Sequence, residues 1–266
     1  SKTNWISWAY APCIAALPSI FNRHVSESKD CIAVWHGRVQ YAQALDLQMK
    51  ICELKKRGLY RDVLLLLEHP PTITLGRNAS MEHLLAREEE LKSQGVVVCN
   101  VDRGGDITFH GPGQLVGYPL LSLSTGERDV HRYMRNLEES LIDLLGHYGI
   151  PAGRDARFTG VWTDKGKIAA LGVHISRWIT RHGFALNVNT DLSFYNMIVP
   201  CGIVGRGVTS MQQELARRID PAEVAERYIP SFASVFHRNM ILMSPDAFLE
   251  DLSYAEAGDV QERVVV

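Results

Sequence analysis

The order of the apolar segments constrains the fold of this chain more than any other feature of its sequence. Strand-like runs come in neighbouring groups, and helical patterns lie between the groups rather than after every strand. That order is typical of α+β proteins (mixed α/β) with mixed or antiparallel sheets, and it disfavours a doubly wound fold. The expected strands are 63–68, 72–76, 96–99, 107–110, 115–120, 160–163, 167–175 and 183–188.

Helical periodicity is clearest between residues 130 and 148. Apolar side chains recur there at helical spacing, and Asp129 occupies the position of an N-cap. An Asp-Pro pair at 220–221 predicts another helix start, because proline is favoured in the first helical turn. Further helices are expected at 44–54 and 81–93, and Pro230 is expected to interrupt the helix that begins at 221.

Length and composition describe an ordinary globular protein. The chain has 266 residues, of which 46% are hydrophobic and 22% charged. It has no internal repeat or low-complexity linker, so a single main domain is expected. A net charge of −2 argues against a nucleic-acid-binding protein held by phosphate contacts. The five widely spaced cysteines form no zinc-binding pair and indicate free thiols in a reducing compartment.

The first 26 residues contain no acidic side chain. They carry hydroxyl and apolar residues, with Lys2 and Arg23 as their basic residues. Such segments resemble organelle import sequences, and the alternative is a variable tail. No apolar run is long enough to predict a membrane span.

One cysteine stands in an unusual setting, Val199-Pro200-Cys201-Gly202. Proline and glycine place Cys201 where the backbone turns, and glycine permits a close approach of another group. A free cysteine is most often a core residue, and Cys52 and Cys99, which lie within regular patterns, are expected to be buried in that way. The setting of Cys201 instead indicates a nucleophile for acyl transfer through a thioester.

A thiol is mostly protonated at neutral pH, so this chemistry needs an activating group. His110 and His182 lie near turns, and spacing alone selects neither. Each is more often a hydrogen-bonded structural histidine. Lys167 begins an apolar run. A lysine in this position is usually a solvated strand end, and the functional alternative is that its charge activates the thiol.

Glycines around residues 103–113 suggest a backbone cradle. No Gly-Lys-Ser/Thr sequence follows, so the segment is not a phosphate-binding P-loop. The spacing of Gly111, Gly113 and Gly117 departs from the dinucleotide fingerprint and no helix follows. Two tight turns are the plain alternative.

Taken together, these segments resemble the lipoyl(octanoyl) transferases. The sequence around Cys201 looks most like that of the mitochondrial members. The resemblance runs from about Gly37 to Phe236. It rests on 103–115 (RGGDITFHGPGQL), 159–162 (TGVW), 167–173 (KIAALGV), 182–187 (HGFALN), 198–203 (IVPCGI) and 208–210 (VTS).

The resemblance implies a fold shared with the catalytic domains of lipoate and biotin protein ligases. It also implies that an octanoyl group passes from acyl carrier protein to Cys201 and then to a lysine of a lipoyl domain. Lys167 would lower the pKa of the Cys201 thiol. The acyl site would be lined by Arg103, Gly104, Gly105, Asp106, Ile107, Thr108, Phe109, His110, Ala170, Leu171, Gly172, Gly183, Phe184 and Ala185.

The resemblance and the composition together give the remaining expectations. Residues 1–30 would be a tail or targeting remnant, 31–240 the octanoyltransferase catalytic domain and 241–266 a loosely held acidic tail. Acceptors would be lipoyl domains of 2-oxoacid dehydrogenases and the glycine cleavage H protein, with no cofactor, metal, nucleic acid or membrane involved. The expected location is the mitochondrion, with bacterial cytoplasm or plastid as alternatives.

Two other functions compete with this interpretation. The first is an ATP-dependent lipoate-protein ligase on the same fold, which needs no nucleophilic cysteine. The second is a non-catalytic protein that docks lipoyl domains, which needs neither Lys167 nor Cys201.

Overall fold

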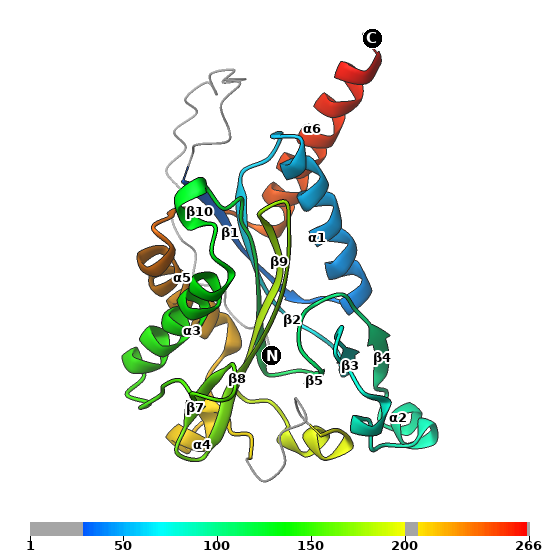
Figure 1. Cartoon of the computed structure of the whole chain (residues 1–266), viewed down its shortest axis with the longest axis vertical. Coiled ribbons are helices and arrows are strands. Elements are labelled where there is room, and N and C mark those ends of the chain that lie inside the picture. Colours follow the sequence, from blue (N-terminus) through cyan, green and yellow to red (C-terminus); the bar gives the residue numbers. More distant parts are fainter. Residues whose placement is uncertain (1–28, 200–206, 265–266) are drawn as a thin grey trace, which may run out of the picture.

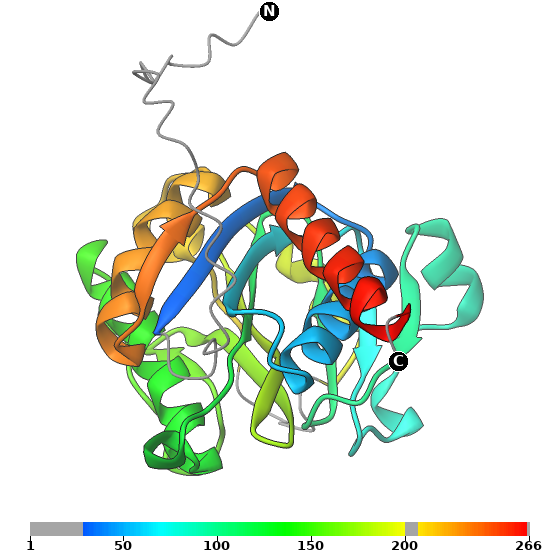
Figure 2. The same cartoon turned by 90° about the horizontal axis from the view of Figure 1, so that it is seen from above.

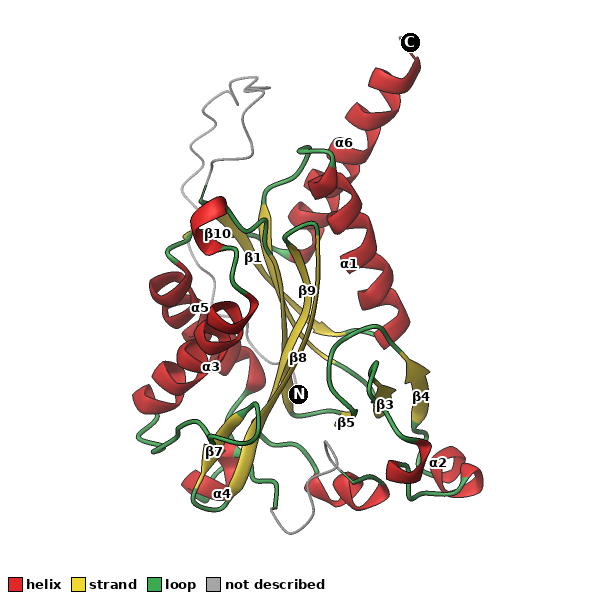
Figure 3. Cartoon of the chain, in the orientation of Figure 1, coloured by secondary structure: helices red, strands yellow, loops and turns green. Residues whose placement is uncertain are grey.

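The computed structural model describes residues 29–199 and 207–264 of the chain. Its strands form two sheets, seen beside each other in Figure 3. The larger has the order β10-β1-β2-β6-β9-β8-β7 and the smaller the order β4-β3-β5. The larger sheet comprises β1 (Asp30–Arg38), β2 (Asp62–Glu68), β6 (Gln114–Leu120), β7 (Val161–Thr163), β8 (Gly166–Ser176), β9 (Ile179–Asn187) and β10 (Asn239–Leu242). The smaller comprises β3 (Thr72–Leu75), β4 (Val97–Asn100) and β5 (Ile107–His110).

Strand directions are mixed in both sheets. Strand β1 is parallel to its neighbours β2 and β10, whereas the ladder from β2 through β6, β9 and β8 to β7 is antiparallel. In the small sheet, β3 is parallel to β4 and antiparallel to β5. The expected mixed α/β class is therefore confirmed.

Helices cover both faces of the large sheet (Figures 1 and 2). Helices α3 (Val130–His147) and α5 (Pro221–Phe236) pack on one face, and α1 (Tyr41–Lys56) and α6 (Pro245–Val264) on the other. Each face buries its own apolar cluster. A third cluster lies under the small sheet. The remaining helical segments are η2 (Met81–His83), α2 (Glu88–Ser93), η3 (Thr125–Glu127), η4 (Leu192–Met197) and α4 (Met211–Leu215). None of the helices within the described ranges is long and apolar enough to cross a membrane.

Two predicted helix starts are confirmed by their capping bonds. The Asp129 carboxylate accepts a hydrogen bond from Arg132 N (3.0 Å) at the start of α3. The Asp220 carboxylate accepts one from Ala222 N (2.9 Å) at the start of α5. In both cases the side chain satisfies a backbone N–H that the first helical turn leaves unpaired.

Two helix predictions are wrong because packing outweighs local preference. Helix α5 continues through Pro230, since Tyr228 and Phe232 on either side of it are completely buried in the core. The predicted helix at 81–93 is split into η2 and α2. Between them, Leu85 N and Ala86 N donate to Met197 O, so this stretch bonds to a neighbouring segment instead of to itself.

Two other expectations are also corrected. Residues 246–264 lie in α6, where Phe248 and Leu252 are buried against α1 and the sheet, so the first turns of this helix are not loosely held. Cys99 is only half-buried because β4 is an edge strand, and its neighbour Val97 is 54% exposed. Cys52 is buried as expected.

Candidate active site

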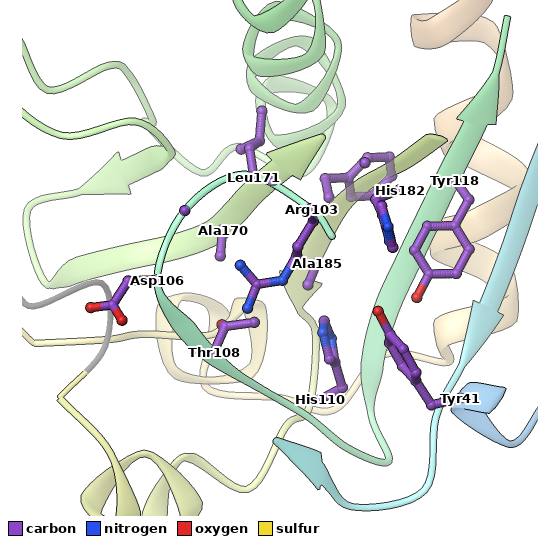
Figure 4. Close-up of a pocket in the computed structure, with 14 residues that line it drawn as sticks. Tyr41, Arg103, Asp106, Thr108, His110, Tyr118, Ala170, Leu171, His182 and Ala185 are labelled. Atoms are coloured by element: carbon purple, nitrogen blue, oxygen red, sulfur yellow. The ribbon is translucent and has the colours of Figure 1, made fainter. Parts of the chain in front are cut away.

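A pocket lies between the two sheets, where β8, β9 and β6 face β5 and the start of α1 (Figure 4). It contains about 450 Å³ of space, including the part that opens to solvent. The lining residues are Tyr41, Arg103, Gly105, Asp106, Thr108, His110, Tyr118, Ala170, Leu171, Gly172, His182, Gly183, Phe184 and Ala185.

The structure brings most of the predicted acyl-site residues together around this pocket. The exceptions are Gly104, Ile107 and Phe109, which do not line it. Ile107 and Phe109 are buried in the cluster under the small sheet, whereas Thr108 and His110 face the pocket. Successive residues of a strand point to opposite faces, so β5 divides its side chains between the core and the pocket.

The floor of the pocket is built from small residues on two neighbouring strands. Ala170 pairs with Ala185, and Gly172 pairs with Gly183, across the β8–β9 ladder. These paired side chains are too small to fill the space above the sheet. Leu171 and Phe184 also border the pocket, but their side chains belong to the apolar cluster beneath α3 and α5. The result is a narrow slot with close backbone walls, which suits an unbranched apolar chain.

Arg103 closes one side of the slot by binding the small sheet. Its guanidinium donates to Thr74 Oγ1 from Nε (3.1 Å) and to Thr74 O from Nη2 (2.7 Å). Gly104 then crosses β8, where its N–H donates to Val173 O (2.8 Å). A Cβ atom at Gly172 would lie 2.8 Å from Gly104 O, so this crossing requires glycine in β8.

His110 belongs to a buried polar network behind the pocket. Its Nδ1 donates to Gln114 Oε1 (2.9 Å), because the Gln114 amide nitrogen is already donating to Asn187 Oδ1 (3.0 Å). Asn187 in turn donates to Thr209 O (3.1 Å). Burial is the largest cause that lowers the pKa of His110 well below its ordinary value, so the imidazole is neutral.

Two tyrosines at the far end of the slot were not predicted from the sequence. Tyr41 begins α1, and Tyr118 lies on β6 with its hydroxyl 2.7 Å from His69 Nε2. Burial raises the pKa of Tyr41 to about 12, so this phenol keeps its proton. Neither tyrosine stands in a distinctive sequence pattern, and only the strand and helix placement brings them to the pocket.

Lys167 is not a solvated strand end, because it is 6% exposed at the start of β8. Its ammonium lies 4.8 Å from the centre of the Trp162 ring. A Cβ atom at Gly160 would be 3.2 Å from Lys167 Cε and 2.8 Å from Ala169 O. The end of the lysine side chain therefore lies beside Trp162 and Gly160, and Lys167 does not itself line the pocket.

Backbone bonds connect Lys167 to the segment that follows the predicted nucleophile. Lys167 N donates to Gly207 O, and Thr209 N donates to Lys167 O, both at 3.0 Å. Val199 N donates to His83 O (2.8 Å) on the preceding side. Cys201, two residues after Val199, lies outside the described residues.

Comparison with known proteins agrees with the geometry. Residues 40–233 match the model of the lipoyl protein ligase A/B catalytic domain. The chain belongs to this family.

Proteins named octanoyltransferase are similar to most of this acyltransferase. The Solibacter usitatus protein is 51% identical over 80% of this chain and 96% of its own length. The Chloroflexus aggregans protein is 49% identical over 77% of this chain and 95% of its own. These relatives are bacterial and do not support the expected mitochondrial location.

Solved structures show the same fold at low sequence identity. A putative lipoate protein ligase from T. acidophilum with bound lipoic acid has a TM-score of 0.66 and 15% identity, covering 85% of this chain and 93% of that one. A lipoate-protein ligase A bound with ATP has a TM-score of 0.60 and 16% identity, covering 85% of this chain and 93% of that one.

Proposed function

We propose that this acyltransferase moves an octanoyl group from acyl carrier protein to a lysine of a lipoyl domain, through a thioester on Cys201. The observation that carries the proposal is the small-residue slot of β8 and β9, whose lining begins on β8 at Ala170, three residues after the buried Lys167. The slot would hold the apolar acyl chain, and Lys167 on the same strand would lie toward its reacting end.

The reaction has two acyl-transfer steps. The Cys201 thiolate attacks the thioester carbonyl of the donor, a new C–S bond forms, and the carrier-protein thiol leaves. The acceptor lysine amine then attacks the enzyme thioester, an amide bond forms, and the Cys201 thiolate leaves again. Lys167 carries the positive charge that stabilises the thiolate and exchanges protons with the leaving thiol and the incoming amine.

The donor is already activated as a thioester, so the reaction needs no nucleotide. The donor is octanoyl-acyl carrier protein, and the acceptors are lipoyl domains of 2-oxoacid dehydrogenases and the glycine cleavage H protein. An acyl thioester already holds the free energy that an adenylate would otherwise supply.

The intact mass of the protein after mixing with octanoyl-carrier protein tests this mechanism. The wild type is expected to gain one hydroxylamine-labile octanoyl group. Cys201→Ser is expected to form no thioester, and the control Cys99→Ser, changed at a half-buried thiol outside the pocket, is expected to acylate normally. Full transfer activity in Cys201→Ala would refute the proposed nucleophile.

A lipoate-protein ligase is the competing function, because ligases share this fold. Transfer is measured with octanoyl-carrier protein and an apo lipoyl domain after apyrase has removed nucleotides. The proposed transferase remains active under these conditions. Loss of transfer would favour the ligase.

A further inference from the structure

His182 lines the far end of the pocket with one ring nitrogen unused. Its side chain is only 2% exposed, and Nε2 lies 2.9 Å from Asp102 Oδ1. Within the described part of the chain, Nδ1 is buried and has no hydrogen-bond partner. A buried polar atom without a partner is costly, so an unused nitrogen in a pocket wall indicates a ligand atom or a water.

The hydrogen-bond partners of His182 determine whether the ligand atom at Nδ1 must be a donor or an acceptor. Burial is the largest cause that lowers the pKa of His182 to about 4, so the ring is neutral near pH 7. Asp102 is a carboxylate that also binds Arg181, and it can only accept hydrogen bonds. The single ring proton is therefore on Nε2, and Nδ1 is an acceptor that requires a donor.

The neighbouring tyrosine does not supply this donor. His69 Nδ1 lies 2.7 Å from Val39 O, a carbonyl that can only accept, so the His69 proton is on Nδ1. His69 Nε2 is then an acceptor and takes the proton of the Tyr118 hydroxyl at 2.7 Å. Figure 4 shows the tyrosine and histidine side chains gathered at this end of the slot.

Strand register places this polar end at the reach of an eight-carbon chain. His182 pairs with Val173, six residues along β8 from Lys167, which is at most about 20 Å at the usual rise of a strand because β8 has an irregularity between Lys167 and Ala169. An extended octanoyl chain spans roughly 9 Å, given C–C bonds of about 1.5 Å. If the lysine side chain reaches along the strand by its length of about 6 Å from Cα to Nζ, at most about 5 Å remains, which is enough for one water.

We propose that His182 determines acyl-chain specificity by forming a polar stop at the end of the slot, where Nδ1 binds a hydrogen-bond donor. The donor is a water molecule when octanoyl fills the slot. A longer apolar chain displaces this water and leaves the acceptor unpaired, whereas a chain with a terminal hydroxyl replaces it. The inference rests on the proposed function, since it assumes an acyl chain in this pocket.

Two donors of equal length test the polar stop. Nonanoyl-carrier protein and 8-hydroxyoctanoyl-carrier protein have acyl chains with the same number of heavy atoms and differ in a terminal methyl or hydroxyl. In the wild type, kcat/KM is expected to favour the hydroxylated chain by roughly fivefold or more. The nonanoyl chain leaves the Nδ1 acceptor of His182 unpaired, whereas the terminal hydroxyl donates to it. Octanoyl transfer is measured alongside as the reference.

Two variants separate polarity from shape. His182→Met removes the acceptor at similar length and is expected to abolish most of the preference for the hydroxylated chain. His182→Gln keeps a polar tip and is expected to retain the wild-type preference. The backbone of His182 has φ 58°, so all variants are first compared by circular dichroism and thermal unfolding.

Three results would overturn the polar stop. One is a wild type that transfers nonanoyl as well as or better than 8-hydroxyoctanoyl, which decides the matter even if His182→Met does not fold. Another is an unchanged preference in a folded His182→Met. The third is an equal loss of preference in His182→Gln, which would make shape the cause. A wild type that transfers no octanoyl would instead contradict the function proposed above, and this inference with it.

Discussion

At the scale of single residues, the environment of Lys167 is set by two neighbours on the preceding hairpin strand. Trp162 presents the face of its ring to the ammonium at 4.8 Å, a favourable position for a cation. Gly160 leaves room for the lysine stem, and its N–H donates to the buried carboxylate of Glu138 (3.1 Å). The lysine side chain is thereby positioned by Trp162 and Gly160.

Gly160→Ala is predicted to disturb this arrangement. The new Cβ would lie 2.8 Å from Ala169 O and 3.2 Å from Lys167 Cε, at a φ of +134° that side chains rarely adopt. Acyl transfer is expected to fall at least tenfold, since a misplacement of about 1 Å can cost 10²-fold in rate. The control is Gly153→Ala, where a Cβ would have nothing within 4 Å. Equal rates in the two variants would contradict the prediction.

Lys167 itself is predicted to be needed for proton transfer as well as for charge. Lys167→Arg keeps a charge that cannot give up its proton, and Lys167→Met keeps only the stem. Both are expected to lose most acyl transfer while the fold survives. Iodoacetamide alkylation of Cys201 is expected to shift to higher pH in Lys167→Met. An unchanged alkylation profile with normal transfer would return Lys167 to a structural role.

At the scale of elements, the slot depends on how closely the 103–105 loop crosses β8. Gly104 N donates to Val173 O at 2.8 Å, and a Cβ at Gly172 would press on Gly104 O at 2.8 Å. The contact is between two backbones, which cannot move aside as a flexible side chain can. The loop also carries Arg103, so any shift changes the wall of the pocket.

Gly172→Ala is therefore predicted to weaken both the fold and donor binding. Overpacking of this kind costs about 1–3 kcal/mol, and KM for the octanoyl donor is expected to rise several-fold. Thermal unfolding and transfer kinetics measure the two effects. As a control, Gly146→Ala places its Cβ in open space within α3 and is expected to be neutral or slightly stabilising. A Gly172→Ala protein with wild-type stability and KM would show that the loop yields freely.

Elements with a strong local signal could be predicted from the sequence. The β7–β8 hairpin and the start of α3 match their expectation because turn residues, capping and periodicity act locally. Strands β1 and β10 were missed, since their parallel pairing joins residues about 200 positions apart and leaves no local turn signal. The path of α5 through Pro230 likewise depends on tertiary packing.

The candidate site also combines residues that a local sequence pattern predicts with residues that only tertiary packing brings together. A glycine-rich loop and runs of small residues were visible in the sequence, and most of the residues they contain line the pocket. Tyr41 and Tyr118 were not, because an ordinary tyrosine becomes part of a pocket only through the packing of α1 against β6 and β9. The alternation that removes Ile107 and Phe109 from the lining could have been applied to β5 in advance.

At the scale of the whole molecule, the pocket is built around histidines that folding holds neutral. His69 and His182 are 0% and 1% exposed, and burial is the largest cause that lowers the pKa of each to about 4. Unfolding restores an ordinary pKa near 6.5. Between pH 6.5 and 4 the unfolded chain therefore binds protons that the folded chain does not, and stability falls as the pH falls.

The free energy of unfolding is predicted to depend on pH with a slope set by these residues. Each contributes about 1.4 kcal/mol per pH unit while only the unfolded state is protonated. His69→Gln removes one such group and keeps an oxygen that can accept from Tyr118, so its slope between pH 6 and 5 is expected to be shallower by about that amount. Urea unfolding at several pH values measures the slope. His147→Gln, changed where the side chain is 61% exposed, is expected to keep the wild-type slope. If His69→Gln also keeps it, His69 takes up a proton in the folded state as readily as in the unfolded one, and the neutral ring assigned here is wrong.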